Sequence, residues 1–371
     1  MNRLFLLIIL LTSLVLPALG GVSAHPPRKK AQPGPSAPRR EDGKVWIENV
    51  QPWKLDKMAN SVMGVLASAT RSLGEDVSYE YLMGLSGSAF RLQFHEEWCP
   101  SSPHSFCGVE TFQGAMNALP YNLVHHEVKK DDPAGVRKIR AAVKASIDRG
   151  VPVLYGSEEE GLIVGYQKGG EEWLCVHPYR FQEGRFVETK LPWEVRILSG
   201  KRTPPSRLTC LRESLARAVK LAETKAAGKY ACGFSAWEKW IQGLKDSKLL
   251  EKANAATLRG TMQGNFWIYT SLVDARTAAA VYLRQAAKEF EGQIGKKATE
   301  HLLRAADLYT EMVEEVLARK CPVEIAPPPP DAKSDPNWTP AMRAEEAAVL
   351  EKALELERRA IAEIQAALAD M

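Results

Sequence analysis

The stretch VPVLYGSEEEGLIVGYQKGGEEWLCVH, residues 151–177, decides the fold class of this chain. It holds short runs of apolar residues, and glycine or charged residues separate each run from the next. Runs of this kind predict strands at 151–155, 161–166 and 172–177. Because the connections between them are short, we expect neighbouring strands to run antiparallel, as a meander.

Helical patterns precede this meander. Apolar residues recur at helical spacing in 59–72, in 78–90 and in 133–149, and each recurrence predicts an amphipathic helix. Helices ahead of antiparallel strands indicate an α+β domain. We place the bounds of this domain at residues 44–203.

From residue 204 the pattern becomes helical throughout. Long segments with apolar residues at helical spacing predict an all-α helical bundle over residues 204–320. Four consecutive prolines, Pro327–Pro330, mark residues 321–340 as a stiff, Pro-rich linker. The periodic segment 341–371 predicts a C-terminal helix that folds back onto the bundle, with a coiled-coil oligomer as the alternative.

The first 43 residues carry no domain pattern. Residues 1–24 combine Arg3, an apolar run and the small residues Val22-Ser23-Ala24, as secretory signal peptides do. The run is shorter than the about 20 residues of a membrane span. We therefore expect a cleaved signal peptide, no transmembrane span after cleavage and a secreted or periplasmic protein, with an uncleaved anchor as the alternative. Residues 25–43 are basic and proline-rich, which predicts a disordered linker.

The charge distribution bears on the possible partners. The formal charge of +4 comes entirely from the residues before Lys44, so the rest of the chain is balanced. A balanced chain lacks the basic surface that nucleic acids require, and we expect no nucleic-acid partner. We also expect no cofactor. The expected ligand is a peptide or small molecule of unknown identity, and the oligomeric state stays open.

Two histidines and two cysteines lie close together in the chain, namely His95, Cys99, His104 and Cys107. Two thiols and two imidazoles suit tetrahedral zinc. The rival is a disulfide between Cys99 and Cys107, which an oxidising compartment favours, and free thiols are the third possibility. Of the three we expect the disulfide. A helical stretch, 110–119, also follows Cys107, and a thiol at a helix start is a candidate nucleophile.

One segment resembles a known family. The run LGEDVSYEYLMGLSGSAFRL, residues 73–92, is similar to the N-terminal domain of the butirosin-biosynthesis-H-like proteins, which are relatives of C39-like, papain-fold cysteine peptidases. Gly165-Tyr166 and His177-Pro178-Tyr179 stand where that family has its "GY" turn and its "DPY". A looser likeness covers most of residues 50–320. The resemblance implies a papain/C39-like domain, with helices and an antiparallel sheet, followed by a helical domain.

The same resemblance implies a catalytic cysteine at the start of the first helix, a histidine on a strand and an acid that orients the histidine. This sequence has Ser61 in the first place, Glu160 or Gly161 in the second and His177 in the third. Loss of the thiol chemistry is the favoured interpretation. The alternative is a rewired triad in which His177 serves Ser61 as base and Glu160 orients the ring.

These observations give the expected function. We expect a secreted C39-like, butirosin-H-like protein that is catalytically degenerate and acts by binding. The alternative is a divergent papain-fold hydrolase or acyltransferase that uses Cys107 or Ser61 as its nucleophile. A cysteine or serine within hydrogen-bond reach of a histidine in a cleft would favour the enzyme.

Overall fold

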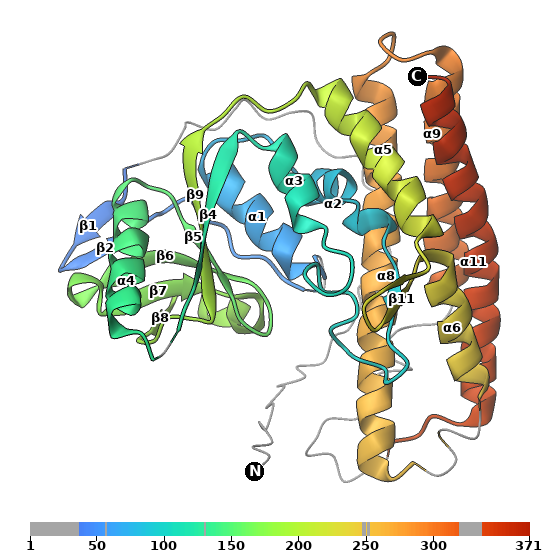
Figure 1. The fold of residues 1–371 in the computed structure, drawn as a ribbon, viewed down its shortest axis with the longest axis horizontal. Helices are drawn as coiled ribbons and strands as arrows, with labels where there is room; N and C mark the ends of the chain where they lie inside the picture. The colour runs from blue at the N-terminus through green and yellow to red at the C-terminus, as the bar shows by residue number, and fades with distance from the viewer. Residues whose placement is uncertain (1–36, 56–57, 130, 247–249, 251–252, 319–335) are drawn as a thin grey trace.

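The computed structural model describes residues 37–55, 58–129, 131–246, 250, 253–318 and 336–371. A sheet with accompanying helices lies beside a set of long helices that run roughly parallel to one another (Figure 1). This arrangement confirms the α+β fold class and the C-terminal helical region. The signal peptide predicted for residues 1–24 lies outside the described residues.

An antiparallel sheet forms the centre of the first part. Among the described residues it has eight strands, in the order β1-β2-β6-β5-β9-β4, with β7 beside β6 and β8 beside β7. Strands β5, β6 and β7 are the meander predicted from residues 151–177. The bounds are β1 Arg39–Glu41, β2 Lys44–Trp46, β4 Tyr121–Glu127, β5 Val153–Gly156, β6 Gly161–Gln167, β7 Glu172–Val176, β8 Phe186–Glu188 and β9 Glu194–Lys201.

The sheet begins earlier in the chain than the sequence predicted. Within the expected linker 25–43, Arg39–Glu41 pair with Lys44–Trp46 as a hairpin. Asp42 and Gly43 have φ values of 48° and 74°, which are the left-handed values that an Asp-Gly hairpin turn adopts. The prediction of disorder is therefore wrong from residue 39 onward. Residues 25–36 of that linker lie outside the described residues.

Short helices accompany the sheet, and their starts follow from local capping. The side chain of Asn60 accepts a hydrogen bond from the Met63 amide at 3.1 Å, so helix α1 begins at Ser61. The helices predicted for 59–72 and 133–149 are confirmed, and that for 78–90 ends early, at the left-handed Gly87. The bounds are α1 Ser61–Ser72, α2 Tyr79–Ser86, α3 Phe112–Ala118 and α4 Pro133–Asp148.

Long helices form the second part. The C-terminal helix α11, Pro340–Ala369, packs along α9, α6 and α5, which confirms that the C-terminal segment folds back onto the bundle. A π-helical turn, Met312–Leu317, continues α9. The bounds are α5 Arg207–Glu223, α6 Gly233–Lys245, α8 Ala255–Glu289, α9 Lys296–Glu311 and α11 Pro340–Ala369.

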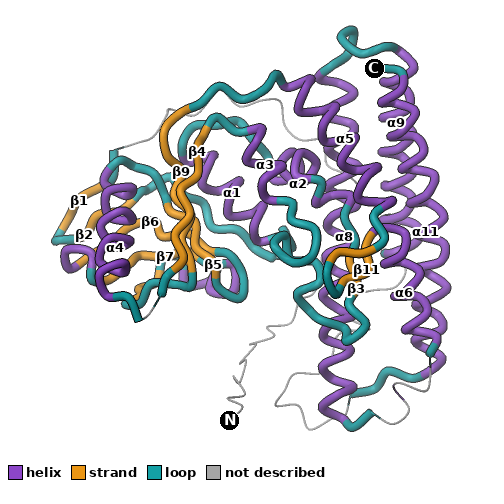
Figure 2. Tube along the Cα trace, viewed as in Figure 1, coloured by secondary structure: helices purple, strands orange, loops and turns teal. Residues whose placement is uncertain are grey.

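The helical region also contains strands, which the sequence analysis did not predict. Strands β10, Ala226–Ala227, and β11, Tyr230–Cys232, form a hairpin around Gly228, whose φ is 58°. Strand β11 then pairs with β3, Gln93–Phe94, from the first part (Figure 2). The expectation of a purely helical segment over 204–320 is wrong here, because this pairing satisfies backbone groups that a helix would otherwise satisfy.

One hydrophobic core joins the two parts, because buried residues of both belong to a single cluster whose first member in the chain is Val45 and whose last is Ala367. Helix α2 approaches α8 so closely that a Cβ atom on Gly84 would lie 2.1 Å from the ring of Tyr282. Between the long helices, the fully buried Arg276 pairs with Glu357 at 2.7 Å. The division near residue 203 thus separates two kinds of secondary structure that share a single core.

The predicted linker 321–340 is also shorter than expected. Trp338 is buried, and its ring centroid lies 5.6 Å from that of Trp98 in an edge-on contact. An aromatic ring anchored in this way is part of the fold, so the linker prediction is wrong at its C-terminal end. Residues 321–335 lie outside the described residues.

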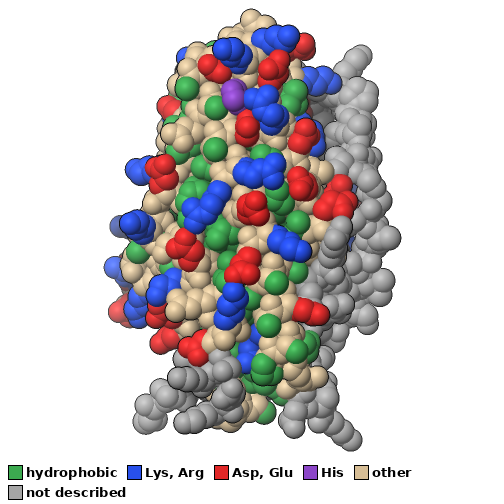
Figure 3. Space-filling model, turned by 90° about the vertical axis from the view of Figure 1, so that its right-hand side faces the viewer, with side chains coloured by type: hydrophobic (Ala, Val, Ile, Leu, Met, Phe, Trp, Pro, Cys, Tyr) green, Lys and Arg blue, Asp and Glu red, His purple; other side chains and the backbone are tan. Residues whose placement is uncertain are grey.

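The exposed face of the helical part carries interleaved charges, with blue and red side chains alternating over the surface in Figure 3. Exposed ion pairs such as Arg358–Glu238, at 2.8 Å, join neighbouring helices. Within the described ranges, no helix combines the length and the apolar character needed to cross a membrane.

Candidate functional site

A cavity of about 310 Å³ lies where the two parts meet. Its walls come from the start of α1, from a loop that includes Pro100–Ser105, and from the face of α8 between Gln263 and Ala275. The lining also includes Glu158, Glu159, the exposed Tyr179 and residues between Met83 and Gln93. This volume lies at the lower end of the range for small-molecule sites. We therefore take the cavity as the candidate functional site.

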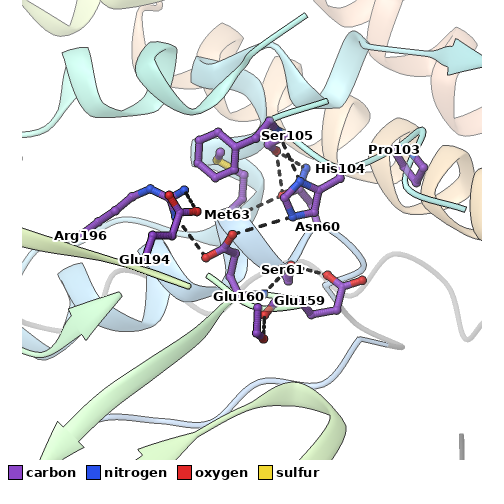
Figure 4. Close-up of polar contacts among 12 residues, drawn as sticks. Asn60, Ser61, Met63, Pro103, His104, Ser105, Glu159, Glu160, Glu194 and Arg196 are labelled. Atoms are coloured by element: carbon purple, nitrogen blue, oxygen red, sulfur yellow. Dashed lines mark hydrogen bonds and ion pairs between the residues drawn. The ribbon is translucent and has the colours of Figure 1, made fainter. Parts of the chain in front are cut away.

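Ser61 lies at the cavity wall, in the first turn of α1, and its hydroxyl group both donates and accepts a hydrogen bond. The Ser61 hydroxyl donates a hydrogen bond to a carboxylate oxygen of Glu159. The Ser61 hydroxyl oxygen in turn accepts a hydrogen bond from the backbone N–H of Glu160 at 3.2 Å. Figure 4 shows the Ser61 side chain between these two neighbours. The hydroxyl that the sequence placed at the helix start thus has a carboxyl group as its partner.

Glu159 is the acid that contacts Ser61. Burial raises the pKa of this carboxyl group to about 7, while hydrogen bonds from Ser61 and Tyr179 act in the opposite direction by favouring the ionised form. A carboxyl group with this pKa changes its protonation state near neutral pH. It can therefore accept or donate a proton inside the cavity.

The carboxyl group of Glu160 faces away from Ser61 and into a buried charged network (Figure 4). It lies 3.2 Å from the Arg196 guanidinium and 3.8 Å from Nε2 of His104. Burial raises the pKa of Glu160 to about 8, and burial lowers that of His104 to about 4. The His104 imidazole is therefore neutral at pH 7, and Glu160 shares Arg196 with Glu194.

His177 does not act on Ser61 in this structure. Its Nε2 atom lies 3.2 Å from the Glu159 carbonyl oxygen and 3.3 Å from the Ser157 hydroxyl, and its Nδ1 atom accepts a hydrogen bond from the Tyr179 amide. Burial lowers the pKa of His177 to about 4. Since no hydrogen bond joins Ser61 and His177 among the described residues, the three members of the rewired triad are not assembled. The His177 ring instead holds the turn that carries Glu159.

A second carboxyl group, which sequence reasoning missed, meets the start of α1. Asp274 of α8 accepts a hydrogen bond from the Tyr79 hydroxyl at 2.5 Å and others from the backbone amides of Ala59 and Asn60. Burial raises the pKa of Asp274 to about 7. The helical part thus supplies a carboxyl group as hydrogen-bond acceptor at the N-terminal end of α1.

The four residues considered for zinc make different contacts. His104 faces the cavity and Glu160, whereas His95 packs its ring 5.4 Å from the Tyr230 ring. Cys99 and Cys107 are free thiols in the structure, and both interact with the Tyr230 hydroxyl. No cluster of three or more metal-ligating side chains occurs within the described ranges. The disulfide between Cys99 and Cys107 stays a prediction.

Cys107 is also not at a helix start. Helix α3 begins at Phe112, after Thr111, and Gly108 turns the chain away with a φ of 62°. Cys107 therefore lies outside the helix N-terminus at which the sequence placed a candidate nucleophile. Cys107 is absent from the cavity lining as well.

Sequence reasoning identified Ser61 but missed the side chains that surround it. Glu159 and Glu160 are adjacent in a run of three acids, and only the backbone geometry decides which one reaches Ser61. Asp274 carried a weak signal, since it is a charged residue in a largely apolar helical stretch. Trp267 of α8 also lines the cavity, whereas Trp237 and Trp240 are buried.

Comparison with known proteins gives no family. A scan against family models finds no match, and a search of curated proteins finds none either. The likeness of residues 73–92 to the butirosin-H-like proteins therefore stays a prediction, and the case for function rests on the geometry of the cavity.

Proposed function

We propose that this protein acts by binding a small molecule or a peptide segment in the cavity between its two parts, without cysteine chemistry. The observation that carries the proposal is the environment of Ser61. At the start of α1, where a papain-like enzyme needs a thiol beside an imidazole, a hydroxyl meets a carboxyl group and a backbone amide. The nearby His177 is engaged in holding the turn at Glu159.

The lining of the cavity also supports binding. Trp267 and Leu272 supply apolar surface, while Asn60, Ser271 and Glu159 supply hydrogen-bonding groups. Apolar walls with a few converging polar groups are typical of sites that bind small molecules.

Two matched variants on α8 test the binding proposal. Ser271 lines the cavity, so Ser271→Phe fills it, whereas Thr277→Phe adds the same ring to an exposed position of the same helix. We expect a thermal-shift screen of small molecules and short peptides to find compounds that raise the Tm of the wild type and of Thr277→Phe. These compounds should leave the Tm of Ser271→Phe unchanged. Compounds that shift all three proteins equally would contradict binding in the cavity.

A second candidate is acyl transfer through Ser61, and the contact with Glu159 favours it over Cys107. In such a step the Ser61 oxygen would form a bond to an acyl carbon while its proton passes to Glu159, whose pKa of about 7 suits a general base near neutral pH. The bond between that carbon and the leaving group of the acyl donor would then break, and Glu159 would return the proton to the leaving group. The cavity would have to supply donors for the oxyanion, and the Glu160 amide already bonds the Ser61 oxygen. Because acyl transfer needs oxyanion donors in addition to the contacts present, binding is the better-supported function.

Covalent labelling separates the two candidates. Under the binding proposal a fluorophosphonate probe leaves Ser61 unlabelled, and Ser61→Ala keeps the wild-type fold by circular dichroism. A stable adduct at Ser61 that disappears in Glu159→Gln but persists in Glu158→Gln would establish acyl transfer instead. Glu158 is a suitable control because it is the exposed neighbour of Glu159.

A further inference from the structure

The segment between Cys99 and Cys107 forms one wall of the cavity. Five of the seven residues between the two cysteines line it, namely Pro100, Ser101, Pro103, His104 and Ser105. Ser105 also exchanges hydrogen bonds with the Asn60 side chain at 3.0 and 3.1 Å, which connects this wall to the start of α1. A change in the conformation of this loop therefore changes the cavity.

Hydrogen bonds bring the two ends of the loop together. The Ser102 amide and hydroxyl both donate to the Cys99 carbonyl oxygen, at 3.0 and 2.7 Å. The side-chain amide of Gln93 then donates to the carbonyl oxygens of Ser102, at 3.3 Å, and Cys107, at 2.9 Å. Arg91 adds hydrogen bonds to the carbonyl oxygens of Cys107 and His104, at 3.0 and 2.9 Å. The loop is thus closed on itself before any covalent link forms.

The two thiols also meet at one hydroxyl group. Cys99 and Cys107 are both half-buried, and both interact with the hydroxyl of Tyr230 on β11. The other described cysteines, Cys175, Cys210 and Cys232, are buried. Cys99 and Cys107 are therefore the described cysteines that share a neighbouring group, the Tyr230 hydroxyl, and have partial access to solvent.

We propose that Cys99 and Cys107 form a redox pair whose disulfide fixes the 100–106 wall of the cavity. The oxidant is a small disulfide such as glutathione disulfide. One cysteine thiolate attacks a glutathione sulfur and releases one glutathione thiolate. The second cysteine thiolate then attacks the mixed disulfide and releases the other, so two protein thiols are oxidised and one disulfide is reduced. The effect on ligand binding rests on the proposed function, whereas formation of the bond does not.

Peptide mapping tests the bond directly. The full chain is equilibrated in glutathione buffers of increasing oxidising strength, alkylated with N-ethylmaleimide and digested with trypsin. No Lys or Arg lies between Arg91 and Lys129, so both cysteines fall in one peptide. We expect this peptide to lose the mass of two hydrogens and to escape alkylation, while Cys175, Cys210 and Cys232 become alkylated once the protein is unfolded.

Hydrogen exchange tests the consequence for the wall. We expect the backbone amides of Ser101, Ser102 and residues 104–106 to exchange about tenfold more slowly in the oxidised protein, with no change in α4. Cys107→Ser should remove this redox response, and Cys210→Ser should keep it. Alkylation of Cys99 and Cys107 at every glutathione ratio, pairing of either with Cys232, or equal exchange in both states would overturn the proposal. Neither readout uses a ligand, and Ser271→Phe should still form the disulfide, so failure of cavity binding remains distinguishable.

Discussion

At the scale of single residues, the carboxyl groups in and beside the cavity have unusual pKa values. Glu159, Glu160 and Asp274 each have a pKa well above the ordinary value, chiefly because of burial. A raised carboxyl pKa means that the folded protein holds a proton that the unfolded chain has already released. Such groups therefore make the folded state less stable as pH rises from the ordinary pKa to the raised one.

Glu159 gives this effect a testable form. Its pKa is about 7 in the folded protein against 4.5 for the ordinary group, so the stability cost grows between pH 4.5 and 7 and is complete above pH 7. We expect Glu159→Gln, which cannot ionise, to reduce the loss of stability between pH 5 and pH 8 by up to about 3 kcal/mol. Urea denaturation at pH 5 and at pH 8 measures the free energy of unfolding of both proteins and hence this difference.

The neighbour Glu158 provides the control for this measurement. It is exposed, and its charge is the smallest of the influences on the pKa of Glu159, so Glu158→Gln should keep most of the wild-type loss of stability across the same interval. Equal losses in wild type and Glu159→Gln would show that the Glu159 carboxyl group is not held protonated in the folded protein.

At the scale of elements, the contact between α2 and α8 depends on one missing side chain. A Cβ atom on Gly84 would lie 2.1 to 2.4 Å from the ring atoms of Tyr282. The ring cannot move aside easily, because it is buried and its hydroxyl hydrogen-bonds Ser214 at 2.6 Å. The contact thus tolerates only glycine at this position of α2.

We therefore expect Gly84→Ala to lower the free energy of unfolding by about 1–3 kcal/mol, the usual cost of overpacking a core. The matched control is Gly260→Ala in α8, where no atom lies within 4 Å of the added Cβ. There the change should be neutral or stabilising by up to about 1 kcal/mol. Equal effects of the two substitutions in urea denaturation would contradict the close packing of α2 on α8.

Elements with a strong local pattern could be predicted from the sequence. Helices α1 and α4 and strands β5 to β7 follow from periodicity and caps, which act over a few residues. The hairpin at Asp42-Gly43 carried a local signal that its basic, proline-rich surroundings concealed. Pairing of β3 with β11 had no such signal, because Phe94 and Ala231 are distant in the chain and meet only when the two parts pack. Ser61 could be found because it lies at a helix start that the local sequence predicts. Asp274 could not, because it reaches the site only when α8 packs against the first part.

At the scale of the whole molecule, a buried ion pair connects three regions. Arg276 of α8 binds both carboxylate oxygens of Glu357 of α11, at 2.7 and 2.9 Å, and donates to the Ala89 carbonyl oxygen at 2.9 Å. Both charged side chains are almost completely buried. Removing one partner leaves an uncompensated charge in the core, which is far more costly than removing the pair together.

Glu357→Gln should therefore lower the free energy of unfolding by about 3–5 kcal/mol, and Arg276→Met combined with Glu357→Leu should recover part of this loss. The neighbouring exposed pair Arg358–Glu238 is the control, since Glu238→Gln should cost less than about 1 kcal/mol. Urea denaturation with full-length protein measures the three variants against the wild type. A double variant less stable than Glu357→Gln would contradict this account of the pair.

The carboxyl groups around the start of α1 also bear on how such a site can change over time. A single substitution, Ser61→Cys, would place a thiol there, yet Glu159 and Asp274 are close enough to oppose its ionisation. We expect the new thiol to react with iodoacetamide at pH 7 more slowly than a cysteine in an unfolded peptide, and faster once Glu159→Gln is added. A reactive thiol in the single variant would contradict this. The path from this cavity to a thiol enzyme therefore requires coordinated changes in both halves of the chain, because part of the obstacle lies on α8.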